Sequence, residues 1–524
     1  MKTPKRFGNR AGPFAVRERT TQCRGLGAGM QLLGKEESQH ASFCRLEQIG
    51  GPAAIWGLIA ATILAAFYFA TSLYISSHRL LWIDEILTVL NTRVPNWTTI
   101  WKTATQGVDG LPPIYFMVVR VFDNLFGHTD LSVRLPSALA MTGGLLLTFD
   151  CARRLTDGVH GLIALSVLTC SFLPYYGHEA RSYALYFMFS SLALWIWAYD
   201  KNDSRLGAGF FGSAFCLAVT MHYYAILCLV PYAVWEVWNW KPWRLPSRKM
   251  IGAVLGVGCA AAVLWTPIQA GRRLFPTGFW ARPSLDLLRH TLPELFPDGL
   301  LLLAVVAVWI AWAATKESIV PLQPMQPVER IGWFFLLIVP AGYFLAQITH
   351  VYQLRYFICA LPGIAVAFSC WLWRHFHGAW RVSMGVFLIL AAWGVSKQVT
   401  ATRDPNRFYY SPVRQMLNME NVLRNDGKRF FVVVNQGRYM EARHYSKHPE
   451  EYALLVPLDT GNLHETMVLA QYHPMQFWTL EDLKKHARET VLFSPLPGDL
   501  ETLKKAGFQL TIRFDKPLTV AYLE

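Results

Sequence analysis

Titratable side chains gather in the short polar segments that interrupt a largely apolar sequence. Asp84 and Glu85 follow the first long apolar run, and Asp109 lies later in the same polar segment. Ionisable groups beside membrane-spanning helices are costly unless they have partners or a function. Because a carboxylate can take a proton from a hydroxyl or hold a divalent cation, we predict that Asp84 and Glu85 are catalytic.

Further acids, imidazoles and guanidinium groups recur at the ends of later apolar runs. Arginine pairs with phosphate through parallel, charge-assisted hydrogen bonds, so a phosphorylated lipid would suit this set of side chains. The predicted substrate-binding residues are Asp109, His178, Glu179, Arg181, Tyr183, His222, Arg272, Arg273, Arg355 and Tyr356. The candidate ligands for a divalent cation of unknown identity are Asp84, Glu179 and His290.

Several of these residues also have a purely structural interpretation. Arg181 could pair with Glu179 and extend to the lipid headgroups, as arginines at a membrane interface commonly do. Asp109 could be a turn residue beside Gly110, and His222 could be a hydrogen-bonded histidine at a turn between two helices. The sequence alone leaves these alternatives open.

The composition excludes a soluble protein. Of 524 residues, 53% are hydrophobic and 16% are charged, against roughly 25% charged in soluble domains. The net charge of +14 arises largely from an N-terminal tail and from short links between apolar runs, which fits positive-inside topology better than nucleic-acid binding. The nine cysteines form no CxxC pair, so neither a disulfide framework nor a zinc knuckle is indicated.

Apolar runs and basic links predict a mainly α-helical, polytopic membrane protein in three parts. Residues 1–50 form a basic, disordered cytoplasmic tail, residues 51–397 a transmembrane domain, and residues 398–524 a small α/β domain outside the cytoplasm. About eleven spans are expected, near 52–73, 131–151, 159–176, 183–199, 207–222, 223–239, 250–268, 299–315, 331–348, 356–373 and 380–397.

The large outer loop, residues 76–130, is expected to contain juxtamembrane helices. Its run 112–126 has about 15 residues and includes Arg120 and Asp123, so it suits the interface better than a crossing of roughly 30 Å of hydrocarbon. In the C-terminal part, helices are predicted at 412–425 and 480–488, and strands at 430–434, 452–456, 490–493 and 510–514.

This topology places the predicted site residues on the outer face of the inner membrane. A sugar carried by a polyprenyl phosphate would lie with its phosphate beside Arg355 and the Arg272–Arg273 pair, and with its anomeric carbon near the acids. Cations placed where the departing phosphate gains charge stabilise the transition state, and the acceptor hydroxyl needs a positioned base.

A set of motifs in a fixed order resembles the GT-C superfamily. The motifs are the Asp-Glu pair, Gly110-Leu-Pro-Pro-Ile-Tyr115, Phe126-Gly127, Arg134-Leu-Pro-Ser137, Glu179-Ala-Arg-Ser-Tyr183, and Arg355-Tyr356 with Leu361-Pro362. Within that superfamily, the chain looks most like the branch of the protein O-mannosyltransferases and the lipid A aminoarabinose transferase. The match covers roughly residues 76–370.

The resemblance implies an integral-membrane glycosyltransferase with a polyprenyl-phosphate sugar donor and often a divalent cation. It also implies that Asp84 is the catalytic acidic residue and that a juxtamembrane helix lies in the first outer loop. One departure concerns the residue before the Pro-Pro element, which is Leu111 here and a histidine or a charged residue in many relatives. A metal ligand at that position is therefore not supported.

The same sequence features also fit two other functions. A transporter or flippase of lipid-linked sugars would also need many helices and arginines, but it should show paired halves and polar groups near the membrane midplane. A glycan polymerase or ligase would share the donor class and differ in the acceptor. The sequence does not identify the sugar, nor whether the acceptor is a glycan, a lipid or a protein.

Overall fold

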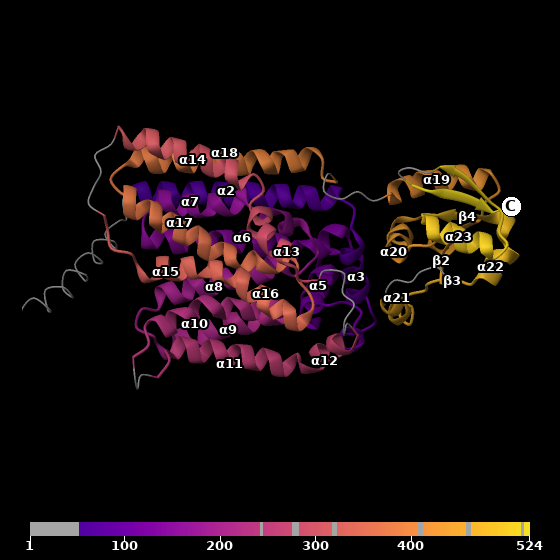
Figure 1. Ribbon diagram of the computed structural model, residues 1–524, viewed down its shortest axis with the longest axis horizontal. Coiled ribbons are helices and arrows are strands. Elements are labelled where there is room, and N and C mark those ends of the chain that lie inside the picture. Colours follow the sequence, from indigo (N-terminus) through magenta and orange to yellow (C-terminus); the bar gives the residue numbers. More distant parts are fainter. Residues whose placement is uncertain are drawn as a thin grey trace, which may run out of the picture. The chain divides into compact units, whose positions relative to one another are not determined.

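The computed structural model describes residues 52–241, 245–274, 282–316, 322–406, 412–456, 463–514 and 518–523. The predicted tail, residues 1–50, lies outside the described residues. The described chain is mainly helical and has one sheet near its C-terminus (Figure 1).

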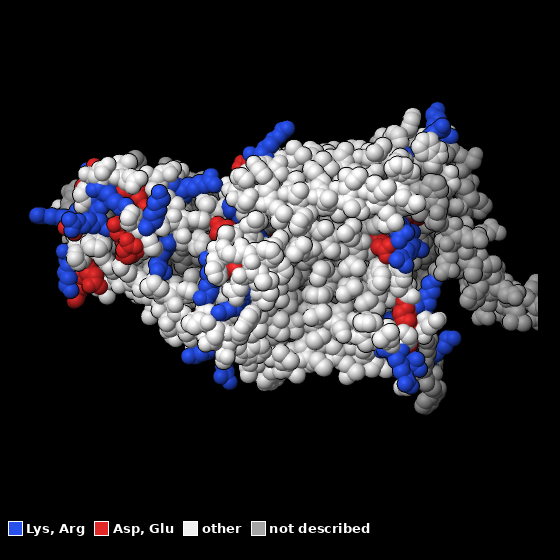
Figure 2. All heavy atoms as spheres, turned by 180° about the vertical axis from the view of Figure 1, so that it is seen from behind, with Lys and Arg blue, Asp and Glu red and all other residues white. Residues whose placement is uncertain are grey.

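Long apolar helices confirm that the chain is a multi-pass membrane protein. Five are long and apolar enough to cross a membrane: Ile55–His78 in α2 (Pro52–His78), α6 (Asp130–Leu155), Pro327–Thr349, Leu354–Phe376, and α18 (Trp380–Arg403). The span Pro327–Thr349 comprises α15 (Pro327–Phe334), η3 (Phe335–Leu337) and α16 (Ile338–Thr349), and the span Leu354–Phe376 comprises η4 (Leu354–Ala360) and α17 (Leu361–Phe376). On the face shown in Figure 2, charged side chains are nearly absent from a broad band of the helical part.

The remaining apolar helices are bent or shorter. The pair α11 (Arg248–Val263) and α12 (Trp265–Leu274) is bent by 64°, and the pair α13 (Leu285–Leu295) and α14 (Gly299–Ala314) by 50°. The shorter ones are α7 (Gly158–Cys170), α8 (Tyr183–Tyr199), α9 (Arg205–Met221), and η2 (Tyr223–Cys228) with α10 (Leu229–Trp238). Each predicted span coincides with one of these helices or with one of the five long ones, while eleven crossings stay a prediction.

Small residues allow α9 and α11 to pack backbone against backbone. A Cβ atom on Gly256 would lie 2.0 Å from the carbonyl oxygen of Gly212, and one on Gly252 would lie 2.3 Å from that of Ala208. Such close approach is typical of helix pairs in membranes. This packing positions α12, which continues α11 after the bend.

The predicted outer loop, residues 76–130, contains three short helices where juxtamembrane helices were predicted, and its place relative to the membrane stays a prediction. They are α3 (Ile83–Thr92), α4 (Trp97–Thr105) and α5 (Pro113–Phe126). Pro113 begins α5, where a missing N–H costs nothing, and Gly127 ends it with a φ of 85°. Helix α5 has only 14 residues and is not among the helices that could cross a membrane.

The C-terminal part contains the predicted α/β arrangement. Its six-stranded sheet has the order β3-β2-β1-β4-β6-β5, with β1 parallel to β2 and β4, β2 parallel to β3, and β6 antiparallel to β4 and β5. The strands are β1 (Phe430–Val433), β2 (Tyr452–Leu455), β3 (Phe477–Trp478), β4 (Thr490–Phe493), β5 (Leu510–Phe514) and β6 (Val520–Leu523). The helices are α19 (Val413–Asn425), α20 (Gln436–Tyr445), α21 (Leu463–Leu469), α22 (Leu480–Lys485) and α23 (Pro497–Lys505).

Both predicted helices and all four predicted strands of this domain are present. The prediction missed β3 and β6. Strand β3 has only two residues, and β6 is a buried apolar strand that pairs on both sides.

Candidate active site

A buried ion cluster fixes the start of the outer loop to the transmembrane helices. Arg134 of α6 donates from Nε to Glu85 Oε1 at 2.7 Å and from Nη2 to Glu85 Oε2 at 2.6 Å, and Arg79 donates to the same Oε2 at 3.0 Å. The backbone N–H of Ala180 adds a bond of 2.7 Å to Oε1. Burial alone would raise the pKa of Glu85, but the charges of Arg134 and Arg79 lower it, so Glu85 is a carboxylate.

Two further carboxylates are each paired with an arginine from a distant segment. Asp84 Oδ2 accepts from Arg355 Nη1 at 3.2 Å and lies 4.0 Å from Arg181 Nη2. Asp109 is held by both terminal nitrogens of Arg181, at 2.5 and 3.1 Å. The side chain of Asp84 is 22% exposed whereas that of Glu85 is fully buried, so only Asp84 can meet a substrate.

The segment between η1 (Leu173–His178) and α8 adds an acid with unusual properties. Glu179 Oε1 accepts from the indole N–H of Trp82 at 2.8 Å, and Oε2 has no hydrogen-bond partner among the described residues. Burial first and the charge of Glu85 second raise the pKa of Glu179 to about 7. Burial also holds the pKa of His178 well below its usual range, so its imidazole is neutral.

Aromatic rings surround the exposed side of the Asp84–Arg355 pair. The Arg355 guanidinium lies 5.4 Å from the ring centre of Tyr183 and 5.8 Å from that of Trp82. His222 is buried between rings, with its centre 4.8 Å from that of Tyr356 and 5.5 Å from that of Tyr183. The rings of Tyr183 and Trp82 hold the guanidinium by cation–π contact, and its one hydrogen bond among the described residues runs from Nη1 to Asp84.

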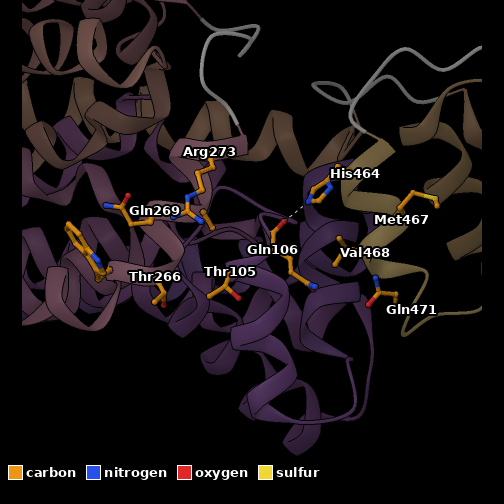
Figure 3. A pocket seen from close by; sticks show the side chains of 11 residues that line it. Thr105, Gln106, Thr266, Gln269, Arg273, His464, Met467, Val468 and Gln471 are labelled. Atoms are coloured by element: carbon orange, nitrogen blue, oxygen red, sulfur yellow. Dashed lines mark hydrogen bonds between the residues drawn. The ribbon is translucent and has the colours of Figure 1, made fainter.

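A cavity of about 780 Å³ lies beside the loop that carries Asp109. It is lined by α4, α12 and α21, and Figure 3 shows their side chains pointing into it. The lining residues are Thr105, Gln106, Trp265, Thr266, Gln269, Ala270, Arg273, His464, Met467, Val468 and Gln471. Arg273 therefore lines a cavity, whereas the neighbouring Arg272 is exposed near the end of α12 without lining it.

The structure brings together most of the predicted site residues. Asp84, Asp109, Glu179, Arg181, Tyr183 and Arg355 form one cluster. His222 adjoins it through Tyr183, and Tyr356 packs on His222. Glu85 lies next to this cluster, but as its buried anchor, which disagrees with the predicted catalytic role. Of these residues, Asp84 keeps that role in the proposal below.

The predicted metal ligands do not converge. His290 is exposed on α13 and lies 3.4 Å from the carboxylate of Asp286, so it does not join Asp84 and Glu179. The carboxylate of Asp84 is already paired with Arg355. Within the described ranges, one group has the geometry to hold a cation, His448 with Glu450 and Glu451 in the C-terminal domain. The cluster therefore does not fit a divalent cation, and no step below uses one.

Sequence reasoning gave no role to three residues that shape the cluster: Arg79, Trp82 and Arg134. A signal for Arg134 existed, because a charged residue within an apolar span needs a partner. Trp82 was hidden among 20 tryptophans, most of which are expected at the membrane interface.

Comparisons with known proteins agree with this fold. Residues 111–265 match the model of a family described as dolichyl-phosphate-mannose-protein mannosyltransferase. The crystal structure of ArnT from Cupriavidus metallidurans in the apo state is similar with a TM-score of 0.59 at 13% identity, over 90% of this chain and 98% of that one. The same protein bound to undecaprenyl phosphate gives a TM-score of 0.58, with the same identity and coverage. No curated protein sequence matches this chain.

The predicted resemblance is thereby confirmed at the level of the fold. The chain has the fold of the GT-C membrane glycosyltransferases. Its particular arrangement is similar to that of ArnT along nearly the whole length of both chains.

Proposed function

We propose that this protein transfers a sugar from a polyprenyl phosphate to an acceptor hydroxyl on the outer face of the membrane. The observation that carries the proposal is the convergence of two arginine–carboxylate pairs, Arg355 with Asp84 and Arg181 with Asp109, from four separate segments. The undecaprenyl phosphate bound to ArnT supports the lipid class of the donor.

Arg355 is the side chain best placed to bind the donor phosphate. Among the described residues its only hydrogen bond goes to Asp84, and its Nε has no partner. When the phosphate takes over this guanidinium, the carboxylate of Asp84 is released to act as a base. Arg272 and Arg273 stay predicted phosphate contacts at the edge of the same site.

The reaction then needs one base and one stabilised leaving group. Asp84 takes the proton of the acceptor hydroxyl as the acceptor oxygen bonds to the anomeric carbon. The bond between that carbon and the phosphate oxygen breaks, and its electron pair leaves with the phosphate, whose charge Arg355 neutralises. Arg181 is a positioning residue, because its guanidinium holds the carboxylate of Asp109 and also donates from Nη1 to the backbone carbonyl oxygen of Asp84 at 3.1 Å.

The positions of the charged groups favour this proposal over a transporter. Asp84 lies in the first turn of α3 and Arg181 lies two residues before α8, so both stand at helix ends. A transporter would place such groups near the middle of broken helices.

The test uses purified protein in lipid nanodiscs with undecaprenyl-phosphate-linked mannose, glucose and galactose. Formation of undecaprenyl phosphate is measured in the presence of delipidated envelope glycans. We expect Asp84→Asn to reduce turnover at least about 100-fold, as loss of a general base does. Asp286→Asn, at an exposed acid on α13, is the matched control. Wild-type turnover by Asp84→Asn would refute the assignment.

A further inference from the structure

The C-terminal domain touches the predicted outer loop at two places, just before Asp109 and on the helix that carries Asp84. His464 Nε2 donates to the carbonyl oxygen of Gln106 at 2.6 Å, three residues before Asp109. His473 Nε2 donates to the carbonyl oxygen of Leu90 at 2.9 Å, on the same helix as Asp84. The first contact fixes α21 against the Asp109 loop, and the second fixes the segment after α21 against α3.

Helix α21 also forms one wall of the cavity beside this loop. His464, Met467 and Val468 of α21 and Gln471, two residues beyond its end, line it opposite the α12 residues, as Figure 3 shows. The other lining groups are mainly amides, hydroxyls and the indole of Trp265. A mixture of amides and an aromatic ring suits a saccharide, which offers hydroxyl groups on its edges and apolar C–H faces.

Glu465 follows His464 on α21 and is partly buried, but it is not among the residues that line the cavity. Its carboxyl group lies within electrostatic range of Asp109, Asp84 and Arg181. Burial and the charges of the two aspartates raise the pKa of Glu465 to about 8, so near neutral pH its carboxyl can both donate and accept a hydrogen bond. A carboxyl group that can both donate and accept suits a neutral hydroxyl group.

We propose that the C-terminal domain supplies part of the substrate-binding site, with α21 as the wall of a saccharide pocket and Glu465 as the residue that binds a saccharide hydroxyl beside Asp84. This inference rests on the proposed function, and it assigns a role to a domain that lacks a recognisable motif. The saccharide is either the sugar of the donor or a glycan acceptor, since both carry such hydroxyls.

The test compares Glu465→Ala and Glu465→Gln in the full-length protein, with Glu501→Ala on α23 as the control for an exposed acid of the same domain. Binding of undecaprenyl-phosphate-linked mannose and of bare undecaprenyl phosphate is titrated by tryptophan fluorescence. Turnover is then measured against the concentration of envelope glycans. Thermal unfolding of each variant shows whether it is folded.

If Glu465 binds the donor sugar, the sugar-bearing lipid should bind more tightly than the bare lipid to the wild-type protein. Glu465→Ala should then lower the ratio of these two affinities at least tenfold. If it binds the acceptor, the same variant should raise the KM for the glycan at least tenfold with less effect on kcat. In either case Glu465→Gln, which keeps a neutral hydrogen-bonding group, should stay within about threefold of wild type.

A folded Glu465→Ala variant with an unchanged ratio of the two affinities and an unchanged KM would overturn the inference. Failure of the proposed function looks different, because the wild-type protein itself would then form no undecaprenyl phosphate from the sugar-bearing lipid in the presence of the glycans.

Discussion

Replacing Arg134 by lysine tests whether the buried ion cluster holds the site together. All five N–H groups of this guanidinium are used: besides the bonds to Glu85, Nη1 donates to the carbonyl oxygens of Ser76 and Arg79 at 2.8 and 2.7 Å, and Nη2 donates to that of Leu80 at 3.0 Å. Lysine has three donors on one atom. At least two buried acceptors therefore lose their partner, each at about 1–3 kcal/mol, so we expect a destabilisation of about 4 kcal/mol.

The measurement is thermal unfolding of purified protein in one detergent, followed by intrinsic fluorescence at a fixed scan rate. We expect Arg134→Lys to lower the Tm by several degrees. The control is Arg154→Lys in the same helix, since Arg154 is half exposed and pairs with Asp150. Such an exposed pair contributes less than about 1 kcal/mol. If the two variants unfold at the same temperature, the reasoning on the five donors is refuted.

Three other predictions concern the site itself. Arg355→Lys should weaken undecaprenyl phosphate binding about tenfold in a fluorescence titration, because a point charge replaces the guanidinium fork; unchanged affinity would exclude Arg355 from phosphate binding. Burial raises the pKa of Glu179 from its ordinary 4.5 to about 7. The stability that this carboxyl group contributes is therefore complete below pH 4.5 and is lost as the pH rises through 7, a change of about 3 kcal/mol in the free energy of unfolding. Glu179→Gln should therefore remove part of the fall in Tm between pH 5 and pH 8, and equal pH profiles would contradict this. Arg181→Lys should reduce kcat more than it weakens binding of the bare lipid, because it positions Asp109 and α3; a loss of lipid affinity alone would instead indicate direct phosphate binding.

The helical framework could be predicted because membranes impose simple rules on sequence. Apolar length and basic links locate the spans, and a run interrupted by Arg120 and Asp123 is identified as interfacial. In the structure Arg120 donates to the carbonyl oxygen of Val94 at 2.6 Å and Asp123 pairs with Arg93 at 2.9 Å, so both charges join α5 to the end of α3. These partners lie about 25 to 30 residues away, and no local pattern predicts them.

The role of the C-terminal domain could not be predicted, for a related reason. Glu465 and His464 lie on a seven-residue helix with no motif. Their proposed role follows only from the nearness of residues more than 350 positions earlier in the chain. The strand pattern of the domain was visible in the sequence, but the face that meets the outer loop was not.

The adjacent pair Asp84-Glu85 shows most clearly where sequence reasoning ends. A helix turns by about 100° per residue, so neighbouring acids on α3 must point in different directions, and one of them turns inward when the helix packs. Glu85 points to Arg134 and also accepts from the N–H of Ala180, which lies between Glu179 and Arg181. One buried carboxylate thus fixes two of the four segments that carry the cluster, those of Asp84 and of Arg181, and leaves Asp84 to pair with Arg355. Glu85→Gln should consequently reduce activity and stability together, whereas Asp84→Asn should reduce activity alone, and thermal unfolding of the two variants separates these roles.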